Sequence, residues 1–256
     1  MQQRRAWTVV SVLVLSGTLA CGGGSETPAT SEAPTAPPVD AATAGHIAGK
    51  VVLAGEPPQA ELIKMSADPF CMTEGHGEQQ SQYFVVGEGN GLENVFVYVK
   101  SGLGDRRFPA PTAPALLDQR GCRYVPHVLG VQVGQPLEVI NSDDTLHNVH
   151  AVPTVNSEFN AGQPIKGMKN VITFTAAEIM VPFKCDVHGW MNAYVGVVDN
   201  PYFAVTANGG AFELRTLPPG TYEIEAWHEK LGSQTQTVTV SEQTTTDVSF
   251  TFTIGR

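Results

Sequence analysis

The sequence predicts an all-β protein. Gly and Pro are frequent, with 26 and 18 copies among 256 residues, whereas charged residues make up only 16%. From residue 46 onward, short runs rich in Val, Ile and Thr alternate with polar residues and end at Gly, Pro or Asn. This period of two is typical of half-buried strands joined by turns. The hydrophobic content of 42% is sufficient for a packed core and excludes a wholly disordered chain.

The N-terminus predicts export. Two arginines precede an apolar stretch that ends near Ala20 and is too short to span a membrane well. Residues 18–21, TLAC, resemble the lipobox of bacterial lipoproteins, although the Leu stands one position later than usual. The resemblance implies a lipoprotein signal peptide over residues 1–20 and lipidation of Cys21. The alternative is an ordinary secretory signal with an unmodified Cys21.

Residues 21–45 are expected to form a flexible tether. They are rich in Gly, Ser, Thr, Pro and Ala, a composition that does not pack a core. A lipid at Cys21 would anchor the protein to a membrane of the bacterial cell envelope, facing the periplasm or the surface. The net charge of −10 argues against nucleic acid as a partner, because phosphate binding needs clustered Lys and Arg.

The four cysteines raise a question of pairing. If Cys21 carries a lipid, then Cys71, Cys122 and Cys185 remain in an oxidising compartment. Three cysteines cannot all form disulfides with one another, so one is left as a free thiol or a metal ligand.

The strongest chemical signal is the run Cys185-Asp186-Val187-His188-Gly189-Trp190-Met191, which places a thiol, an imidazole and a thioether within seven residues. A second imidazole, His147, lies upstream at an expected strand. Soft sulfur together with two imidazoles suits copper better than magnesium or calcium. Two His and one Cys with a weak axial Met form the ligand set of blue-copper electron-transfer sites.

These residues resemble the cupredoxin family over about residues 122–198. The Cys-x2-His-x2-Met spacing is similar to the short ligand loop of amicyanin, and the run up to Asn141 resembles the opening strands of that fold. The resemblance implies a Greek-key β-sandwich with one type 1 copper. The implied metal ligands are His147, Cys185 and His188, with Met191 as the axial ligand. Asn148 matches the position whose side chain braces the ligand loop.

A copper ligand at Cys185 makes Cys71 and Cys122 the natural disulfide. Two alternatives stay open: Cys185 pairs with one of these cysteines, or a second metal site forms from Cys71, His76, Cys122 and His127. Trp190 either shields the copper or lines the electron path, or it simply packs on the end of the sandwich.

The C-terminal part resembles a different family. The stretch from Asn200 to Ile224 contains F-E-L and L-P-P-G-T-Y, which are similar to motifs of the carboxypeptidase regulatory-like, or transthyretin-like, β-sandwich. Matching opening strands stand at Ile47–Pro57 and Val95–Val99. We therefore expect a discontinuous sandwich over residues 46–103 and 200–256 with the cupredoxin domain, residues 104–199, inserted between its strands. The alternative is a linear order of modules.

The expected function is one-electron transfer rather than catalysis. The sequence shows no Ser/His/Asp or paired-carboxylate signature and no second cupredoxin repeat, so an enzyme is not expected. The acidic surface favours a basic redox partner such as a c-type cytochrome. Two alternatives are a copper carrier or sensor, and a structural or binding lipoprotein whose cupredoxin domain holds no metal.

Overall fold

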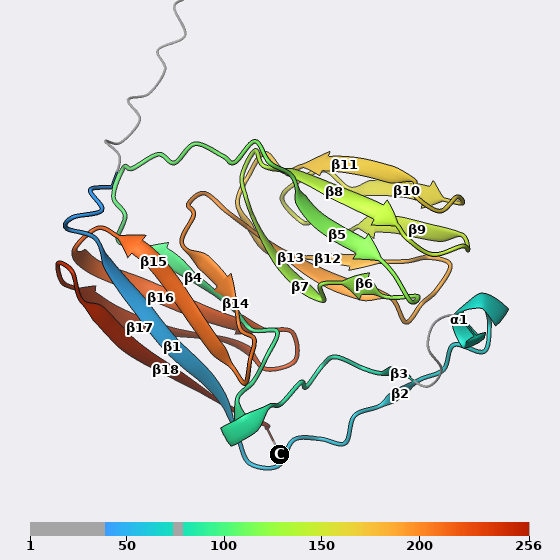
Figure 1. The fold of residues 1–256 in the computed structure, drawn as a ribbon, viewed down its shortest axis with the longest axis horizontal. Helices are drawn as coiled ribbons and strands as arrows, with labels where there is room; N and C mark the ends of the chain where they lie inside the picture. The colour runs from blue at the N-terminus through green and yellow to red at the C-terminus, as the bar shows by residue number, and fades with distance from the viewer. Residues whose placement is uncertain (1–38, 74–78, 256) are drawn as a thin grey trace, which may run out of the picture. The chain divides into compact units, whose positions relative to one another are not determined.

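The computed structural model describes residues 39–73 and 79–255 (Figure 1). The expected signal peptide and Cys21 lie outside these residues. The all-β expectation is confirmed: the described parts contain strands β1 to β18, one five-residue helix, α1 (Pro69–Thr73), and one short 3-10 helix, η1 (Glu88–Asn90). Neither helix in these parts is long and apolar enough to cross a membrane.

One sandwich combines strands from the two ends of the described chain. Its three-stranded sheet has the order β15 (Ala211–Leu217), β1 (Gly45–Ala54), β18 (Thr245–Thr253). Its four-stranded sheet has the order β14 (Phe203–Val205), β4 (Phe96–Ser101), β16 (Gly220–His228), β17 (Gly232–Val240). β1 runs parallel to β18 from His46 to Ala54, and β4 lies between β14 and β16. The alternating apolar residues of these strands, such as Ile47 and Phe250, share one buried core.

The second sandwich is built from the intervening strands. Its five-stranded sheet has the order β10 (Phe159–Gln163), β9 (His147–Ala151), β12 (Glu178–Lys184), β13 (Asn192–Val198), β7 (Val128–Gln132). Its four-stranded sheet has the order β11 (Lys169–Thr173), β8 (Pro136–Asn141), β5 (Ala115–Gln119), β6 (Tyr124–Val125). Gly134, with a positive φ of 84°, turns the chain between β7 and β8. In the sequence, the apolar runs on either side of Gly134 predict a hairpin-like break; this prediction is wrong, because β7 and β8 belong to different sheets.

The order of strands brings the candidate ligands to one end of this sandwich. β9 begins at His147 and pairs with β12, which ends at Lys184. β12 in turn pairs with β13, so residues 185–191 form the connection between two neighbouring strands. The second imidazole and the Cys-His-Met run therefore meet at the same edge of one sheet.

The two sandwiches touch through a third apolar cluster. Phe96 and Tyr98 of β4 pack with Val128 of β7 and Val198 of β13. Gly130 faces Phe96 and Phe203, and Gly196 faces Phe96; a β-carbon at either glycine would come within 3.0 Å of these rings. The absence of side chains at these two positions lets the aromatic rings lie directly on the neighbouring sheet.

A long connection between β1 and β4 reaches the second sandwich. It carries β2 (Leu62–Ile63), α1, β3 (Gln79–Gln80) and η1. Cys71 of α1 forms a disulfide with Cys122, with the two Cα atoms 5.7 Å apart. The helix lies within residues 66–81, whose polar composition predicts a long loop from the sequence. The alternative of a second metal site on Cys71 and Cys122 is wrong, because their sulfurs are bonded to each other.

The disulfide is expected to stabilise the fold measurably. Replacing both partners (Cys71→Ser with Cys122→Ser) should lower the free energy of unfolding by about 2–4 kcal/mol, since the bond closes a long loop in the unfolded chain. Chemical denaturation measures this change. The neighbouring Met72→Ser, at an exposed position, is the control and should change little. Equal midpoints for the double variant and the control would contradict the prediction.

Glu178 is expected to make the stability of the fold depend on pH in the acidic range. Burial raises its pKa, but hydrogen bonds donated by Thr154, Asn156 and the backbone N–H of Val155 outweigh this and lower the pKa to about 2. The folded pKa lies below the unfolded value, so the contribution to stability is present at neutral pH. It is lost as the pH falls through about 4 toward 2.

Glu178→Gln should therefore be less stable than the wild type at pH 7, by less than about 2 kcal/mol because the side chain is partly solvated. The difference should shrink as the pH approaches 2. Urea denaturation at both pH values measures it, with Glu213→Gln, which removes an exposed ion pair to Arg215, as control. A difference that stays constant over this range would refute the assignment.

Candidate metal centre

Four candidate donors are buried at the end of the second sandwich. His147, Cys185, His188 and Met191 are exposed by 0, 2, 1 and 1% respectively. Cys185 is the free cysteine of the described residues. Two backbone hydrogen bonds close the loop that carries three of these donors. The N–H of Cys185 donates to the carbonyl of Met191, and the N–H of Met191 donates to the carbonyl of His188. The loop is therefore short and fixed.

The nitrogen and sulfur atoms of three of these residues converge. One ligating atom each from His147, Cys185 and His188 lies within 4.8 Å of the others. The Nδ1 atoms of the two imidazoles are 3.0 Å apart, and the sulfur of Cys185 is 3.9 Å from Nδ1 of His188. Met191 belongs to the same buried cluster as Cys185.

Two carboxylates determine how the imidazoles are protonated. Nε2 of His147 lies 2.9 Å from Oδ2 of Asp143, and Nε2 of His188 lies 2.9 Å from Oδ2 of Asp68. An ionised carboxylate only accepts hydrogen bonds, so each Nε2 carries a proton. Both Nδ1 atoms then point inward, 3.0 Å from each other and next to the Cys185 sulfur. Burial lowers the pKa of both imidazoles, but the hydrogen bonds to the carboxylates and to Cys185 outweigh it and raise the pKa. Either a proton shared between the two Nδ1 atoms or a bound metal ion fits this arrangement.

The sulfur of Cys185 is prepared as a thiolate. It accepts hydrogen bonds from the backbone N–H groups of Asn148, at 3.3 Å, and His188, at 3.4 Å. Burial raises the pKa of this thiol, but the hydrogen bonds from His147, His188 and the two N–H groups outweigh it and lower the pKa to about 6. The thiolate is the form that binds metal, so the site supplies it near neutral pH.

Asn148 connects the strand that begins at His147 with the ligand loop. Its Oδ1 accepts the backbone N–H of Asp186, and its Nδ2 donates to Asn160 at 2.7 Å. With the N–H to sulfur contact, Asn148 contacts the loop at two residues, Cys185 and Asp186, and its amide is held by Asn160 of β10.

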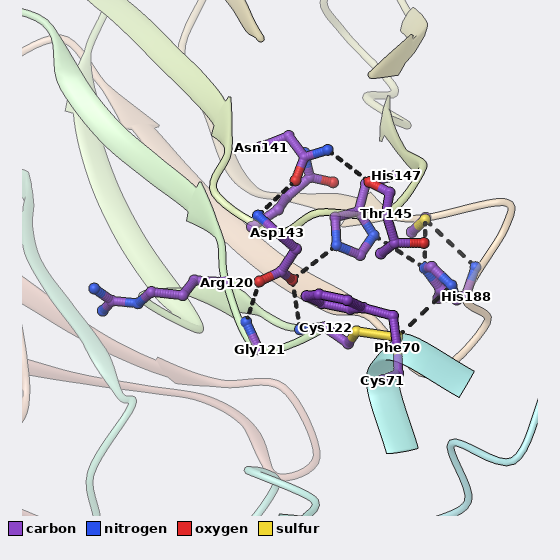
Figure 2. A network of polar contacts seen from close by, with 12 residues as sticks. Phe70, Cys71, Arg120, Gly121, Cys122, Asn141, Asp143, Thr145, His147 and His188 are labelled. Carbon is purple, nitrogen blue, oxygen red and sulfur yellow. Dashed lines mark hydrogen bonds and ion pairs between the residues drawn. A yellow bond between two sulfur atoms is a disulfide. The ribbon is translucent and has the colours of Figure 1, made fainter. Parts of the chain in front are cut away.

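Asp143 is the centre of the network in Figure 2. Its carboxylate accepts the backbone N–H groups of Gly121 and Cys122, at 2.8 and 2.7 Å, in addition to His147. Its own N–H donates to the side chain of Asn141. The burial of Asp143 raises its pKa, but these hydrogen bonds outweigh the effect and lower it. The carboxylate therefore stays charged and fixed beside the imidazole.

Neither carboxylate was predicted from the sequence. Asp143 stands four residues before His147, so local spacing contained a signal for it. Asp68 is 120 residues from His188, and no local pattern connects the two. Only the fold reveals that contact.

The remaining candidate residues lie outside the donor group. His150 pairs with Asp186 and Glu158 on the opposite face of β9. His127 pairs with Glu229 of the other sandwich, and His76 lies outside the described residues. Trp190 packs against the ligand ring, with its centroid 5.0 Å from that of His188, and its Nε1 donates to the carbonyl of Cys122 at 3.1 Å.

This donor set fits copper. A thiolate and two neutral imidazole nitrogens are the ligands of type 1 copper sites, with a thioether as the weak axial ligand. His147, Cys185 and His188 supply the first three, and Met191 lies buried nearby. The carboxylates are taken up by the outer imidazole nitrogens, so hard oxygen donors do not compete for the same space.

Comparisons with known proteins agree with both resemblances. Residues 191–253 match the model of the carboxypeptidase regulatory-like domain. β13 falls in this range, although it pairs with β7 and β12 of the other sandwich. No curated protein sequence matches the chain.

Several solved copper proteins are similar in structure. An amicyanin variant in the Cu(I) form is 28% identical, and the match covers 38% of this chain and 96% of amicyanin, with a TM-score of 0.30. A purple cupredoxin from Nitrosopumilus maritimus is 20% identical, with coverage of 32% and 98% and a TM-score of 0.29. A copper-containing nitrite reductase from Thermus scotoductus SA-01 is 22% identical, with coverage of 39% and a TM-score of 0.30, but the match spans only 25% of the enzyme.

The chain is thus similar to the carboxypeptidase regulatory-like domain over residues 191–253 and, in another region, to cupredoxins such as amicyanin.

Proposed function

We propose that this protein is a type 1 copper protein that transfers single electrons in the bacterial cell envelope, anchored by a lipid on Cys21. The observation that carries the proposal is the convergence of one ligating atom each from His147, Cys185 and His188 within 4.8 Å, with the two Nδ1 atoms 3.0 Å apart beside the Cys185 sulfur. Three donors of the right chemistry are already in place and buried, which favours a metal that stays bound.

Copper supplies a change of one electron between Cu(I) and Cu(II). The residues of the chain keep the donors in place and exclude water. His147 is fixed by Asp143, and Cys185 by two backbone N–H groups. Because a strand, a closed loop and hydrogen bonds hold these donors, little is expected to move when the charge of the metal changes. The N–H groups on the sulfur and the buried surroundings would tune the reduction potential.

Burial of the donors argues against a copper carrier. A carrier must exchange its metal, whereas all four candidate donors here are at most 2% exposed. The other metal-binding groups in the described residues reuse His147 or His188 together with a disulfide sulfur, so they add no second copper site of the kind an oxidase needs. Electron transfer is therefore favoured over both carriage and catalysis.

The partner and the location follow from sequence features. The net charge of −10 favours a redox partner with a basic surface, such as a c-type cytochrome. The apolar N-terminal stretch, Cys21 and the tether favour a lipoprotein at the periplasm or the surface.

A spectroscopic test addresses the copper site. The protein from residue 22 onward, loaded with Cu(II), should show an intense thiolate-to-copper band and narrow copper hyperfine splitting in its EPR spectrum. Cys185→Ser should lose both, because the thiolate is removed. His46→Gln, at a histidine on the other sandwich, should keep both. A wild-type protein that folds but shows no thiolate-to-copper band with Cu(II) would contradict the proposal.

A further inference from the structure

A segment from outside the second sandwich covers the ligand His188. We name residues 64–73 the cap segment; they belong to the connection between β1 and β4 of the other sandwich. Asp68 of this segment lies 2.9 Å from Nε2 of His188, and the sulfur of Cys71 lies 3.8 Å from the same atom. With the cap segment in place, His188 is 1% exposed.

The carboxylate of Asp68 is held rather than free to turn. Its Oδ1 accepts the backbone N–H of Phe70 at 2.7 Å, and its Oδ2 accepts the hydroxyl of Thr145 at 2.9 Å. Thr145 stands two residues before His147, so this one carboxylate connects the regions of both imidazoles. Three donors from three places in the sequence converge on a side chain that is 18% exposed.

The cap segment is fixed to the second sandwich at several points. The disulfide from Cys71 to Cys122 joins it covalently beside Asp143. Met65 is 3% exposed within the core cluster of that sandwich, and Phe70 packs against the same cluster. The cap segment, and Asp68 with it, is therefore held firmly against the sandwich that carries His188.

We propose that Asp68 is a positioning residue for the metal ligand His188, so that the connection between β1 and β4 completes the copper site. This inference rests on the proposed function. A carboxylate that accepts the outer N–H of a ligand imidazole fixes the tautomer and the ring orientation and makes the inner nitrogen a stronger donor. Asp143 does this for His147 from a neighbouring position, and Asp68 does it for His188 from a distant segment.

The test compares Asp68→Ala and Asp68→Asn with Asp144→Ala. Asp144 is an exposed carboxylate near the site and controls for the lost charge. Competition titration with a chromophoric chelator should show that Asp68→Ala binds Cu(II) 10–100-fold more weakly than the wild type, roughly the range for such outer partners. Its reduction potential should rise, because the weaker imidazole donor stabilises Cu(II) less. Asp68→Asn keeps an oxygen acceptor and should recover part of the affinity, and Asp144→Ala should match the wild type.

A measurement on the metal-free protein separates this inference from the copper proposal. Nitrogen-15 NMR of labelled histidines should find His188 protonated at Nε2 in the wild type. In Asp68→Ala, His188 should lose its preference for the Nε2-protonated tautomer. His147 should keep that tautomer, because Asp143 still holds it. Circular dichroism of each variant verifies that it is folded.

Two results have different consequences. If the wild type lacks the thiolate-to-copper band, the proposed function is overturned. In that case, a loss of the Nε2-protonated tautomer of His188 in Asp68→Ala would still support positioning by Asp68. If the wild type binds copper and Asp68→Ala equals Asp144→Ala in affinity, potential and tautomer, the inference about Asp68 is overturned.

Discussion

Two carboxylate–imidazole hydrogen bonds determine the chemistry of this molecule. By accepting the Nε2 protons of His147 and His188, Asp143 and Asp68 direct the two Nδ1 atoms toward each other at 3.0 Å. That distance is favourable only when the two nitrogens share a proton or a metal ion. The sheet, the closed ligand loop and the hydrogen bonds to Cys185 hold every member in place. The candidate donors are therefore brought together by the protein itself.

The disulfide connects the supports of both imidazoles. Cys122 donates its backbone N–H to Asp143, and Cys71 lies three residues after Asp68. Trp190 adds a further link, because its ring packs at a tilt against that of His188 and its Nε1 donates to the carbonyl of Cys122. Of the two interpretations considered for Trp190, packing is visible directly in these contacts. A single cross-link thus stabilises the long connection and keeps two carboxylates at their distances from the ligands.

The sequence predicted what depends on local pattern. Period-two alternation predicted the strands, and the Cys-x2-His-x2-Met spacing predicted a compact loop of donors, because residues three apart in a tight turn stay close together. The interpretation of Gly134 was wrong, because a glycine at a turn does not reveal whether the next strand returns to the same sheet or crosses to the other. The short helix α1 has too few residues for a helical period to show. Asp68 could not be predicted from local pattern, because its partner His188 is 120 residues away. Only the packing of the two sandwiches brings the two side chains together.

The arrangement of strands explains how so distant a residue reaches the site. β1 and β4 are held between strands of the C-terminal part, so the connection between them starts and ends on a fixed framework. A long loop with fixed ends costs only slightly more entropy than a short one, because the closure cost grows with the logarithm of its length. The disulfide then removes much of the remaining freedom. A connection between two strands of one sandwich thereby supplies the carboxylate beside His188 and the cover over it, so the candidate metal centre depends on segments of both sandwiches.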